Sequence, residues 1–298
     1  MANLELEVEI ASYEDRLTED IHHFLAEANG RSVIGFGTDW SPEKALIKAI
    51  SECAERSVLK AVAAPTSNGF AAHNSKERAA QKALLECKER DAFLLGWLSG
   101  RSPKWLEVDS SMQIIKPLLS HGFAVRFGLV AVSDGDPVIV GTLTPGPSFS
   151  SPFGAVFSSA CSATLDGAIQ STAFELRRAA TVILNRADSP AGVSRNASAL
   201  PNDGRSTFEY YLDPANANDL NYYFENSQDP LEVTFPHTRF DFHSCEIKDP
   251  ALKVIVAHCR PEESQDLFFG RPDSSKICYE RFQRYSIEPA NARVMPLP

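Results

Sequence analysis

The pattern Glu-Cys-x-Glu-Arg occurs twice in this chain, at residues 52–56 and again at residues 86–90. Each copy lies in a segment whose apolar residues recur with the period of an α-helix, so its two glutamates and its arginine share one helical face. Two such helices are either ordinary solvated surface, with charges paired between successive turns, or parts of a site in which acidic groups hold a cation. The pattern alone favours solvated surface.

Both helices have recognisable limits. Ser41 is suited to cap the first helix, and Pro42 follows in the first-turn position, where a missing N–H costs nothing. The second helix is predicted to begin near Asn74 and to end near Gly100. A rotation of about 100° per residue places Glu89 nearly opposite the apolar stripe of this helix, so its side chain is expected to face solvent.

Other apolar segments predict strands and one further helix. A short strand with a turn at Gly35–Gly37 precedes the first helix. Residues 123–143 form two apolar segments around an Asp-Gly-Asp-Pro turn, which is typical of a β-hairpin. Residues 162–185 predict a third amphipathic helix, and residues 251–259 predict a strand.

Composition limits the classes of partner. The 298 residues carry a formal net charge of -10, which argues against binding to a nucleic-acid backbone or to an anionic membrane surface. No apolar segment has the length of a signal-peptide core or of a membrane span. The six cysteines lie far apart, as expected for reduced thiols packed in the interior. These features predict a cytoplasmic protein with no nucleic-acid partner and no membrane partner.

The chain shows no clean domain boundary. We interpret residues 1–298 as one domain of the α/β class in its mixed α+β form, with helices packed on β-sheets. Residues 1–32 are expected to form an N-terminal extension, and the polar residues 186–206 a mobile loop. Residues 290–298 form a proline-bearing C-terminal tail.

If the glutamates of the repeated pattern face one cleft, their negative charges need to be neutralised by cations. Glu52, Glu55, Glu86 and Glu89 would repel one another, and their pKa values would rise unless cations neutralised them. Mg²⁺ meets this need because it takes oxygen ligands and keeps coordination positions open for phosphate oxygens. Such a site could bind Mg-ATP, and the sequence contains no GxxxxGK[ST] phosphate-binding loop.

Longer motifs resemble those of a known family. The stretch SNGFAAHNSKERAAQKALLECKERDAF, residues 67–93, resembles the central signature of the YcaO family, a turn of small residues followed by a helix with ExxERD. Residues 35–56 look like the first ATP-site segment of that family, and residues 158–176 look like its third helix. Residues 252–270 are similar to its late strand and the loop that follows. The resemblance implies a YcaO-like fold with an ATP site between helices.

The resemblance also implies roles for individual residues. The implied metal ligands are Glu52, Glu55, Glu86 and Glu89, and the implied cofactors are ATP and Mg²⁺. The implied nucleotide-binding set comprises Ser67, Asn68, Asn74, Glu86, Glu89, Arg90 and Arg56. The implied catalytic set comprises Glu175 and the two prolines of the C-terminal Pro-X-Pro, Pro296 and Pro298.

The reaction that the resemblance implies is ATP-dependent cyclodehydration of a ribosomally made precursor peptide. A Cys, Ser or Thr side chain attacks the preceding carbonyl, ATP phosphorylates the resulting oxygen, and phosphate leaves as a thiazoline or oxazoline forms. Relatives commonly use a module that grips the leader peptide, so we expect a separate leader-peptide-binding partner protein of the ThiF-like kind. A homodimer is also expected.

Three alternatives stay open at the level of sequence. The same activation could capture sulfur and give a backbone thioamide. Arg78 and Ser171 stand where the family has an acidic residue and an arginine, and the connector between the first two motifs is short, so a non-catalytic scaffold subunit is a second alternative. A zinc site is the third; its candidate ligands are His243, Cys245, His258 and Cys259, but their spacing matches no familiar closed site.

Overall fold

The computed structural model describes residues 3–297 with the exception of residues 29, 31, 65, 150–152, 189–199, 249–251 and 273. The strands in chain order are β1 (Asn3–Leu6), β2 (Val8–Glu14), β3 (His22–Ala28), β4 (Val33–Asp39), β5 (Phe70–His73), β6 (Lys104–Leu106), β7 (Phe123–Ser133), β8 (Asp136–Pro145), β9 (Val156–Cys161), β10 (Leu231–Val233), β11 (Thr238–Ile247) and β12 (Leu252–Pro261). The helices are α1 (Pro42–Ala61), α2 (Lys76–Leu98), α3 (Lys116–Ser120), α4 (Leu165–Ala187), α5 (Gly204–Leu212), α6 (Pro214–Ala217), α7 (Asn221–Glu225) and α8 (Tyr279–Gln283), with short 3-10 turns η1 (Asn218–Leu220) and η2 (Ser274–Lys276).

Tertiary contacts divide the chain into two compact units. The first unit comprises residues 1–87 and 236–262, and the second comprises residues 88–235 and 263–298. Helix α2 is continuous through the boundary, so it belongs to the first unit up to Cys87 and to the second from Lys88 onward. Both units combine helices with β-sheets, and the predicted mixed α+β class is confirmed.

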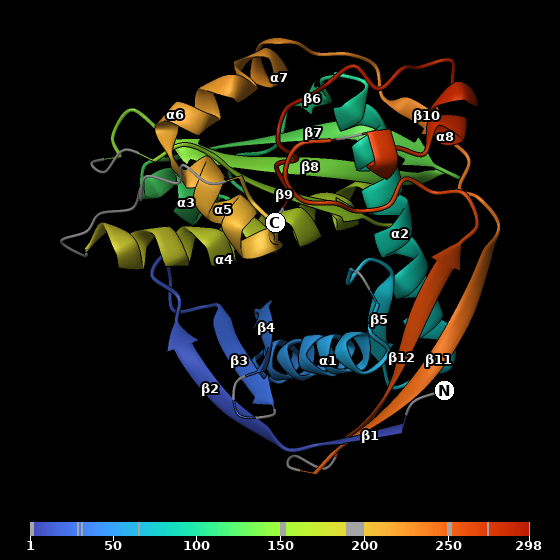
Figure 1. Ribbon diagram of the computed structural model, residues 1–298. Helices are drawn as coiled ribbons and strands as arrows, with labels where there is room; N and C mark the ends of the chain where they lie inside the picture. Colours follow the sequence, from blue (N-terminus) through green and yellow to red (C-terminus); the bar gives the residue numbers. More distant parts are fainter. Residues whose placement is uncertain are drawn as a thin grey trace. The chain divides into compact units, whose positions relative to one another are not determined.

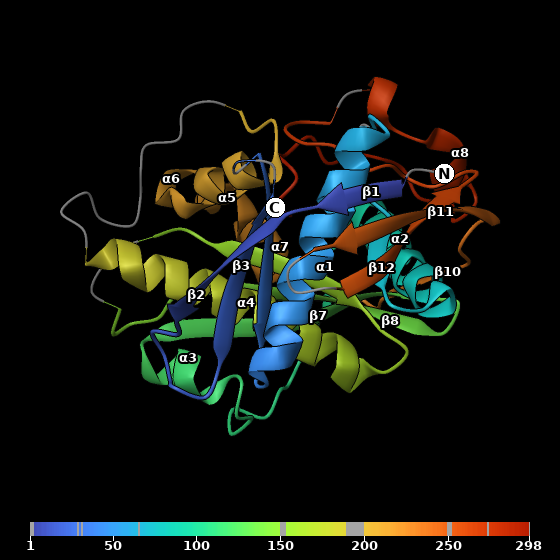
Figure 2. The same cartoon turned by 90° about the horizontal axis from the view of Figure 1, so that it is seen from below.

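The first unit contains two sheets that share one helix. The four-stranded sheet has the order β1-β11-β12-β5, in which β1 is parallel to β11 and the other neighbours are antiparallel. The three-stranded antiparallel sheet has the order β2-β3-β4. Helix α1 contacts β4 and β3 of the small sheet and β5 and β12 of the large one (Figure 1). Figure 2 shows from below how this helix lies along β3.

Two glycines of β4 set how closely α1 can approach. A Cβ at Gly35 would lie 2.2 Å from the carbonyl oxygen of Ala49, and a Cβ at Gly37 would lie 1.8 Å from the carbonyl oxygen of Ala45. Both glycines lie within a paired strand. The expected turn at Gly35–Gly37 is therefore wrong: these residues lack a side chain because the backbone of α1 occupies the space where one would be.

The limits of the first two helices follow the predictions. Ser41 caps α1, and its side chain accepts a hydrogen bond from the backbone of Lys44 at 3.3 Å. Helix α2 begins at Lys76 and ends at Leu98, close to the expected limits. The apolar stripe of α1 is buried in the core of the first unit, together with residues of β5, β11 and β12.

The second unit is built on a five-stranded sheet. Its order is β10-β7-β8-β9, and β6 pairs with β7. The predicted hairpin is confirmed as β7 and β8, which are joined by Asp134 and Gly135 with φ angles of 48° and 87°. Positive φ at both positions is the conformation that a tight hairpin turn requires. Helix α4 packs on β8 and β9, and this helix agrees with the third predicted one.

The turn of this hairpin also binds Lys88 of α2. The Nζ atom of Lys88 lies 2.7 Å from an oxygen of Asp136 and 3.2 Å from an oxygen of Asp134. Lys88 is buried, and these two carboxylates raise the pKa of its amine although burial opposes this. A buried cation with two anionic partners is electrostatically satisfied.

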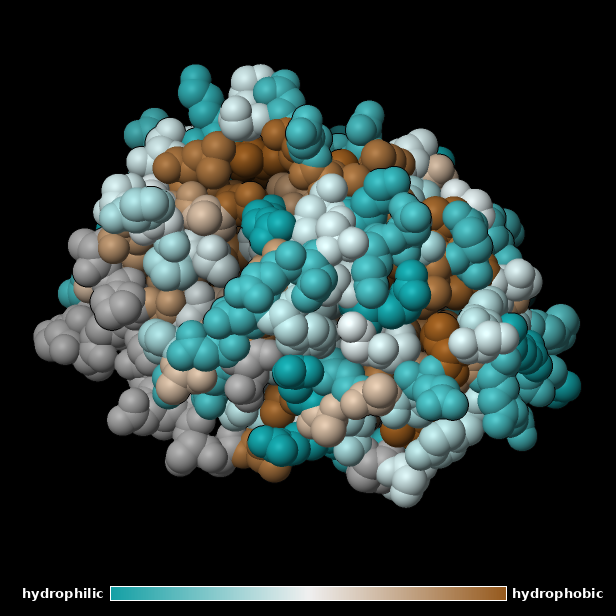
Figure 3. Space-filling view, turned by 90° about the horizontal axis from the view of Figure 1, so that it is seen from above, coloured by the Kyte–Doolittle hydropathy of each residue, from teal (hydrophilic) through white to brown (hydrophobic). Residues whose placement is uncertain are grey.

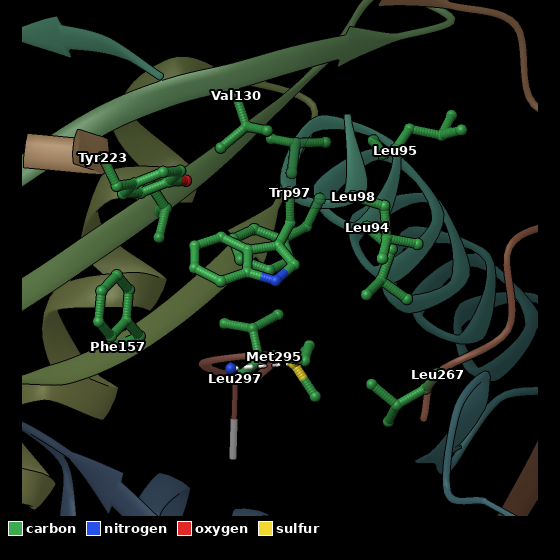
Figure 4. Packing of buried hydrophobic residues seen from close by; sticks show 14 of the residues in the cluster. Leu94, Leu95, Trp97, Leu98, Val130, Phe157, Tyr223, Leu267, Met295 and Leu297 are labelled. Atoms are coloured by element: carbon green, nitrogen blue, oxygen red, sulfur yellow. Dashed lines mark hydrogen bonds between the residues drawn. The ribbon is translucent and has the colours of Figure 1, made fainter. Parts of the chain in front are cut away.

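The core of the second unit gathers around Trp97, which is 1% exposed. Figure 4 shows the Trp97 ring between Phe157 and Tyr223 on one side and the leucines of α2 on the other. The end of the chain belongs to the same cluster, because Met295 and Leu297 are both fully buried there. The tail is therefore part of this core up to residue 297.

Hydrogen bonds hold the tail in this position. The backbone N–H of Asn291 donates to the carbonyl of Leu98 at 2.8 Å, and its side chain donates to the carbonyl of Trp97 at the same distance. The phenol of Tyr211 donates to the carbonyl of Val294 at 2.5 Å. Helix α2 and the tail are thus linked both by apolar packing and by polar bonds.

Several expectations about segments can be compared with the structure. Residues 1–32, expected as an N-terminal extension, supply β1, β2 and β3. The segment expected to form a loop at 186–206 is shorter at both ends, since α4 runs to Ala187 and α5 begins at Gly204; residues 189–199 lie outside the described residues. The six cysteines are free thiols, and four of them are buried, as expected.

The surface combines polar and apolar regions. Figure 3 shows a patch of apolar side chains near the upper edge of the view, with hydrophilic side chains around it. None of the helices in the described part of the chain has both the length and the apolar character that a bilayer crossing needs.

Candidate functional site

The first copy of the repeated pattern lies beside the outer edge of β4. One carboxylate oxygen of Glu52 accepts a hydrogen bond from the backbone N–H of Phe36 at 2.7 Å. Its other oxygen lies 2.6 Å from the guanidinium of Arg56, which donates to the carbonyl of Ile34 at 2.8 Å. Since β4 is the last strand of its sheet, these side chains of α1 satisfy backbone groups that a neighbouring strand would otherwise bind.

Glu55 makes the corresponding contact with the other sheet of the first unit. Its carboxylate accepts a hydrogen bond from the backbone N–H of Ala72 at 2.6 Å, and β5 is the last strand of the four-stranded sheet. Burial raises the pKa of Glu55 to about 8, with the charge of Glu52 acting in the same direction and Lys82 opposing it. With a pKa of about 8, this carboxyl group is mostly protonated at neutral pH, although the charge of Lys82 opposes this.

The turn before α2 contains the other predicted residues of the first unit. Ser67 and Asn74 are exposed, whereas Asn68 is half-buried. The side-chain oxygen of Asn68 is buried and has no hydrogen-bond partner among the described residues. Glu86 is half-buried on α2, one turn before Glu89.

Glu89 is buried, which corrects the expectation of a solvent-facing side chain. It is 9% exposed, and one carboxylate oxygen accepts a hydrogen bond of 2.5 Å from the hydroxyl of Ser159 on β9. The backbone of Cys161 also donates to this carboxylate. Burial raises the pKa of Glu89, the nearby charge of Glu175 adds to the effect, and Arg90 together with these hydrogen bonds opposes it. The expectation from helical rotation is wrong because every residue of α2 from Cys87 to Leu98 except Arg90 is buried, so no face of this half of the helix is open to solvent.

The guanidinium of Arg90 contacts Glu89 through one nitrogen, and another of its nitrogens is buried without a hydrogen bond to any described residue. Its Nη1 atom lies 3.5 Å from a carboxylate oxygen of Glu89. Its Nε atom is buried and has no hydrogen-bond partner among the described residues. A buried donor without an acceptor costs free energy, and an anionic ligand would satisfy it. Two of the predicted nucleotide-binding residues, Asn68 and Arg90, thus each have one buried polar atom that no described residue binds.

The predicted catalytic residues lie in the second unit. Glu175 on α4 forms an ion pair of 2.5 Å with Arg178, and its side chain is 44% exposed. Pro296 is buried in the tail. Pro298 lies outside the described residues.

The predicted residues therefore form two groups, one in each unit. Glu52, Glu55 and Arg56 are brought together on α1, and Glu89 and Arg90 lie with Ser159 and near Glu175. Within the described residues, no three His, Cys, Asp or Glu side chains are gathered closely enough to hold a metal ion, which applies equally to the proposed zinc ligands. The donor chemistry still suits Mg²⁺, because every predicted ligand is a carboxylate.

Sequence reasoning missed two residues that act on the predicted ones. Ser159 binds Glu89 and lies on a strand far along the chain, and Lys82 influences the charge of Glu55. Lys82 could have been noticed from the sequence, since it lies four residues before Glu86 on the same helix. No local pattern indicates Ser159, because its contact depends on how β9 packs against α2.

Comparisons with known proteins identify the family of the chain. The family model described as YcaO cyclodehydratase, ATP- and Mg²⁺-binding, matches residues 54–259. No curated protein sequence matches the chain. Among solved structures, the YcaO protein from Methanopyrus kandleri bound with AMPPCP and Mg²⁺ is 14% identical, with a TM-score of 0.61, and the alignment covers 91% of each chain.

Two further solved structures share the fold. A chain of the E. coli microcin synthetase McbBCD complex with pro-MccB17 bound is 12% identical, with a TM-score of 0.62, covering 97% of this chain and 96% of that one. A heterocyclase in complex with substrate and cofactor is 12% identical, with a TM-score of 0.65, covering 97% of this chain and 54% of that one. The family match spans more than half of the sequence and includes the second copy of the repeated pattern. The chain therefore belongs to the YcaO family, whose cofactors are ATP and Mg²⁺.

Proposed function

We propose that this protein catalyses the ATP-dependent cyclodehydration of Cys, Ser or Thr residues in a ribosomally made precursor peptide. The observation that carries the proposal is the family match over residues 54–259, a stretch that contains three of the four predicted metal ligands. The buried, unpartnered Nε atom of Arg90 beside Glu89 supports it, because the family's nucleotide would bring an anion to such a donor.

The proposal gives the carboxylates and cations distinct tasks. Glu52, Glu55, Glu86 and Glu89 would hold Mg²⁺, and Arg90 and Arg56 would bind phosphate oxygens. Binding Mg²⁺ would favour the ionised form of Glu55, whose pKa burial raises to about 8. Ser67, Asn68 and Asn74 would contact the nucleotide at the turn before α2.

In the proposed reaction, bound ATP supplies the phosphoryl group that turns the former amide oxygen into a good leaving group. The protein's own task is to position the peptide and to neutralise charge, as in other phosphoryl transfers. Glu175 and the Pro-X-Pro end, Pro296 and Pro298, are the residues that we assign to the reacting peptide. Proline fixes φ, so a tail of this kind loses little conformational freedom when it is held in one place.

The proposed partners follow from the reaction. The substrate would be a precursor peptide, and a separate ThiF-like protein would bind its leader. The microcin synthetase structure, a complex of several chains with its pro-peptide bound, supports an assembly of this kind. We also propose a homodimer and a cytoplasmic location, with neither a nucleic-acid nor a membrane partner.

The first test concerns ATP turnover. We expect Glu86→Gln to abolish Mg-ATP turnover, because it removes a charge from the proposed ligand set and leaves a side chain of the same shape. Circular dichroism and thermal unfolding should match the wild type. Glu225→Gln is the matched control, since Glu225 is an exposed glutamate at the end of α7. Unchanged turnover in Glu86→Gln would contradict the assigned role.

The second measurement identifies the product. A short Cys/Ser/Thr-rich peptide would be sought among the neighbouring reading frames, incubated with the protein, its partner and Mg-ATP, and then analysed by mass spectrometry. We expect the loss of one water molecule for each ring formed. Exchange of oxygen for sulfur would instead indicate thioamidation. Absence of Mg-ATP binding in the wild type would indicate a scaffold subunit and overturn the proposal.

A further inference from the structure

Ser159 occupies a defined place on β9. It lies opposite Val140 of β8, and the preceding Ser158 lies opposite Gly141. A Cβ at Gly141 would meet Thr172 and Leu176 of α4, so this face of the sheet is covered by that helix. Because successive side chains of a strand point to opposite faces, Ser158 faces α4 and Ser159 faces the other way, where it meets Glu89 of α2.

Hydrogen bonds from β9 hold the carboxylate of Glu89 in one orientation. The hydroxyl of Ser159 donates to one oxygen of Glu89 at 2.5 Å, and the backbone of Cys161 donates to the same carboxylate. Both donors come from β9, two residues apart. A glutamate has three side-chain torsions, and two donors on a rigid strand restrict them more than a solvent-exposed helix surface would.

We propose that Ser159 is a positioning residue for Mg-nucleotide binding: its hydroxyl orients the Glu89 carboxylate so that this group can bind Mg²⁺. The inference rests on the proposed function, because it takes Glu89 to be a metal ligand. Carboxylates that bind metals are themselves commonly hydrogen-bonded by a second set of residues, and removing such a partner typically lowers metal affinity about 10–100-fold.

The orientation of the Glu89 carboxylate also affects Arg90. Its Nη1 atom lies 3.5 Å from the oxygen of Glu89 that accepts the Ser159 hydrogen bond. If the carboxylate rotated away from Ser159, it could move fully onto the guanidinium and neutralise it. Ser159 therefore keeps Glu89 apart from a close ion pair with Arg90 and leaves the arginine available for phosphate.

The experiment compares side chains of equal shape. Binding of AMPPCP in the presence of Mg²⁺ would be measured by calorimetry for the wild type and for Ser159→Thr and Ser159→Val, which differ only in the hydroxyl. We expect Ser159→Thr to bind nearly as the wild type does and Ser159→Val to bind about 10–100-fold more weakly. Ser158→Ala, on the neighbouring residue of the same strand, should leave the affinity unchanged.

A second arm separates positioning from general damage to the fold. In EDTA, without Mg²⁺, any remaining affinity for AMPPCP should be the same for Ser159→Thr and Ser159→Val, because the hydroxyl acts through a metal ligand. Thermal unfolding without ligand should also be similar for the two variants. A difference between them that persists equally in EDTA would overturn the metal-specific role.

The outcomes distinguish the inference from the proposed function. If the wild type fails to bind AMPPCP with Mg²⁺, the proposed function is wrong. If the wild type binds and Ser159→Val binds equally well, the function stands and the positioning role of Ser159 is wrong. Should Ser159→Val fold poorly, Ser159→Ala gives the same comparison with a smaller side chain.

Discussion

At the scale of single residues, His258 shows how a folded environment changes a side chain's chemistry. Its ring stacks on Phe70 of the neighbouring strand, with centroids 3.9 Å apart. Burial lowers the pKa of His258 to about 4, the charge of Arg260 adds to the effect, and Asp241 opposes it. The folded protein therefore binds a proton at this ring less readily than the unfolded chain does.

This difference predicts a loss of stability in acid. The unfolded histidine protonates near its usual pKa of 6.5, whereas the folded one stays neutral down to about pH 4, so the free energy of unfolding falls as the pH decreases through that interval. We expect His258 to account for about 1 kcal/mol of the loss between pH 7 and pH 5, a value reduced because the side chain is only half-buried. Urea unfolding of the wild type and of His258→Gln at both pH values tests this.

The control uses a histidine in a different environment. The side chain of His237 is 76% exposed, so His237→Gln makes the same substitution without removing a half-buried ring. If His258→Gln lost as much stability between pH 7 and pH 5 as the wild type, the burial argument would be contradicted.

Residues also show where sequence reasoning reaches its limit. The second helix and its carboxylates could be predicted, because periodicity is a local property. The burial of Glu89 could not, since the strand that encloses it, β9, lies about seventy residues further along the chain. A charged residue opposite an apolar stripe indicates solvent only when nothing else covers that face.

At the scale of elements, α1 explains why the first copy of the pattern is spaced as it is. Lys48, Glu52 and Arg56 follow one another at intervals of four residues and bind the backbone of β4 at Thr38, Phe36 and Ile34. Residues four apart on a helix share a face, and alternate residues of a strand present their backbone groups to the same edge. The motif thus has a structural role in addition to the proposed metal binding.

The same helix depends on the glycines of β4. We expect Gly37→Ala to lower the free energy of unfolding by more than about 3 kcal/mol, because the new Cβ would lie 1.8 Å from a carbonyl of the α1 backbone, which cannot rotate away as a side chain could. Gly100→Ala is the comparison. Gly100 has a φ of 72° with open space around it, so only backbone strain of about 1–2 kcal/mol is expected.

Chemical denaturation of both variants separates the two effects. A loss in Gly37→Ala no larger than in Gly100→Ala would show that α1 can move away from β4 at little cost. The close packing of α1 against β4 would then contribute little to the free energy of unfolding.

At the scale of the whole molecule, the chain passes between its two units three times. It does so within α2, before β11 and after β12. The sequence predicted β4, β7, β8 and β12 and the helices α1, α2 and α4, whereas the pairing of β1 with β11 and of β10 with β7 joins segments far apart in the chain. Local patterns contain no information on such partners, so pairings of this kind could not be predicted from the sequence.

A buried ion pair holds the segment after β12, residues 263–298, against α2. Arg281 on α8 and Asp91 on α2 lie 2.6 Å apart, and both side chains are excluded from solvent. Asp91 also accepts a hydrogen bond from the backbone of Gln265 at 2.7 Å. The residue that directly follows Glu89 and Arg90 in α2 therefore fixes the C-terminal segment in the second unit.

The end of the chain completes that core. We expect Leu297→Ala to lower the free energy of unfolding by about 2–5 kcal/mol, because Leu297 is fully buried in the cluster around Trp97. Leu200→Ala makes the same chemical change at a side chain that is 55% exposed, and it should alter stability by no more than about 0.5 kcal/mol. Denaturant unfolding followed by tryptophan fluorescence measures both. Equal effects in the two variants would mean that the tail frays in solution, and the prolines beyond Met295 would then lack the fixed position that the proposed catalytic role requires.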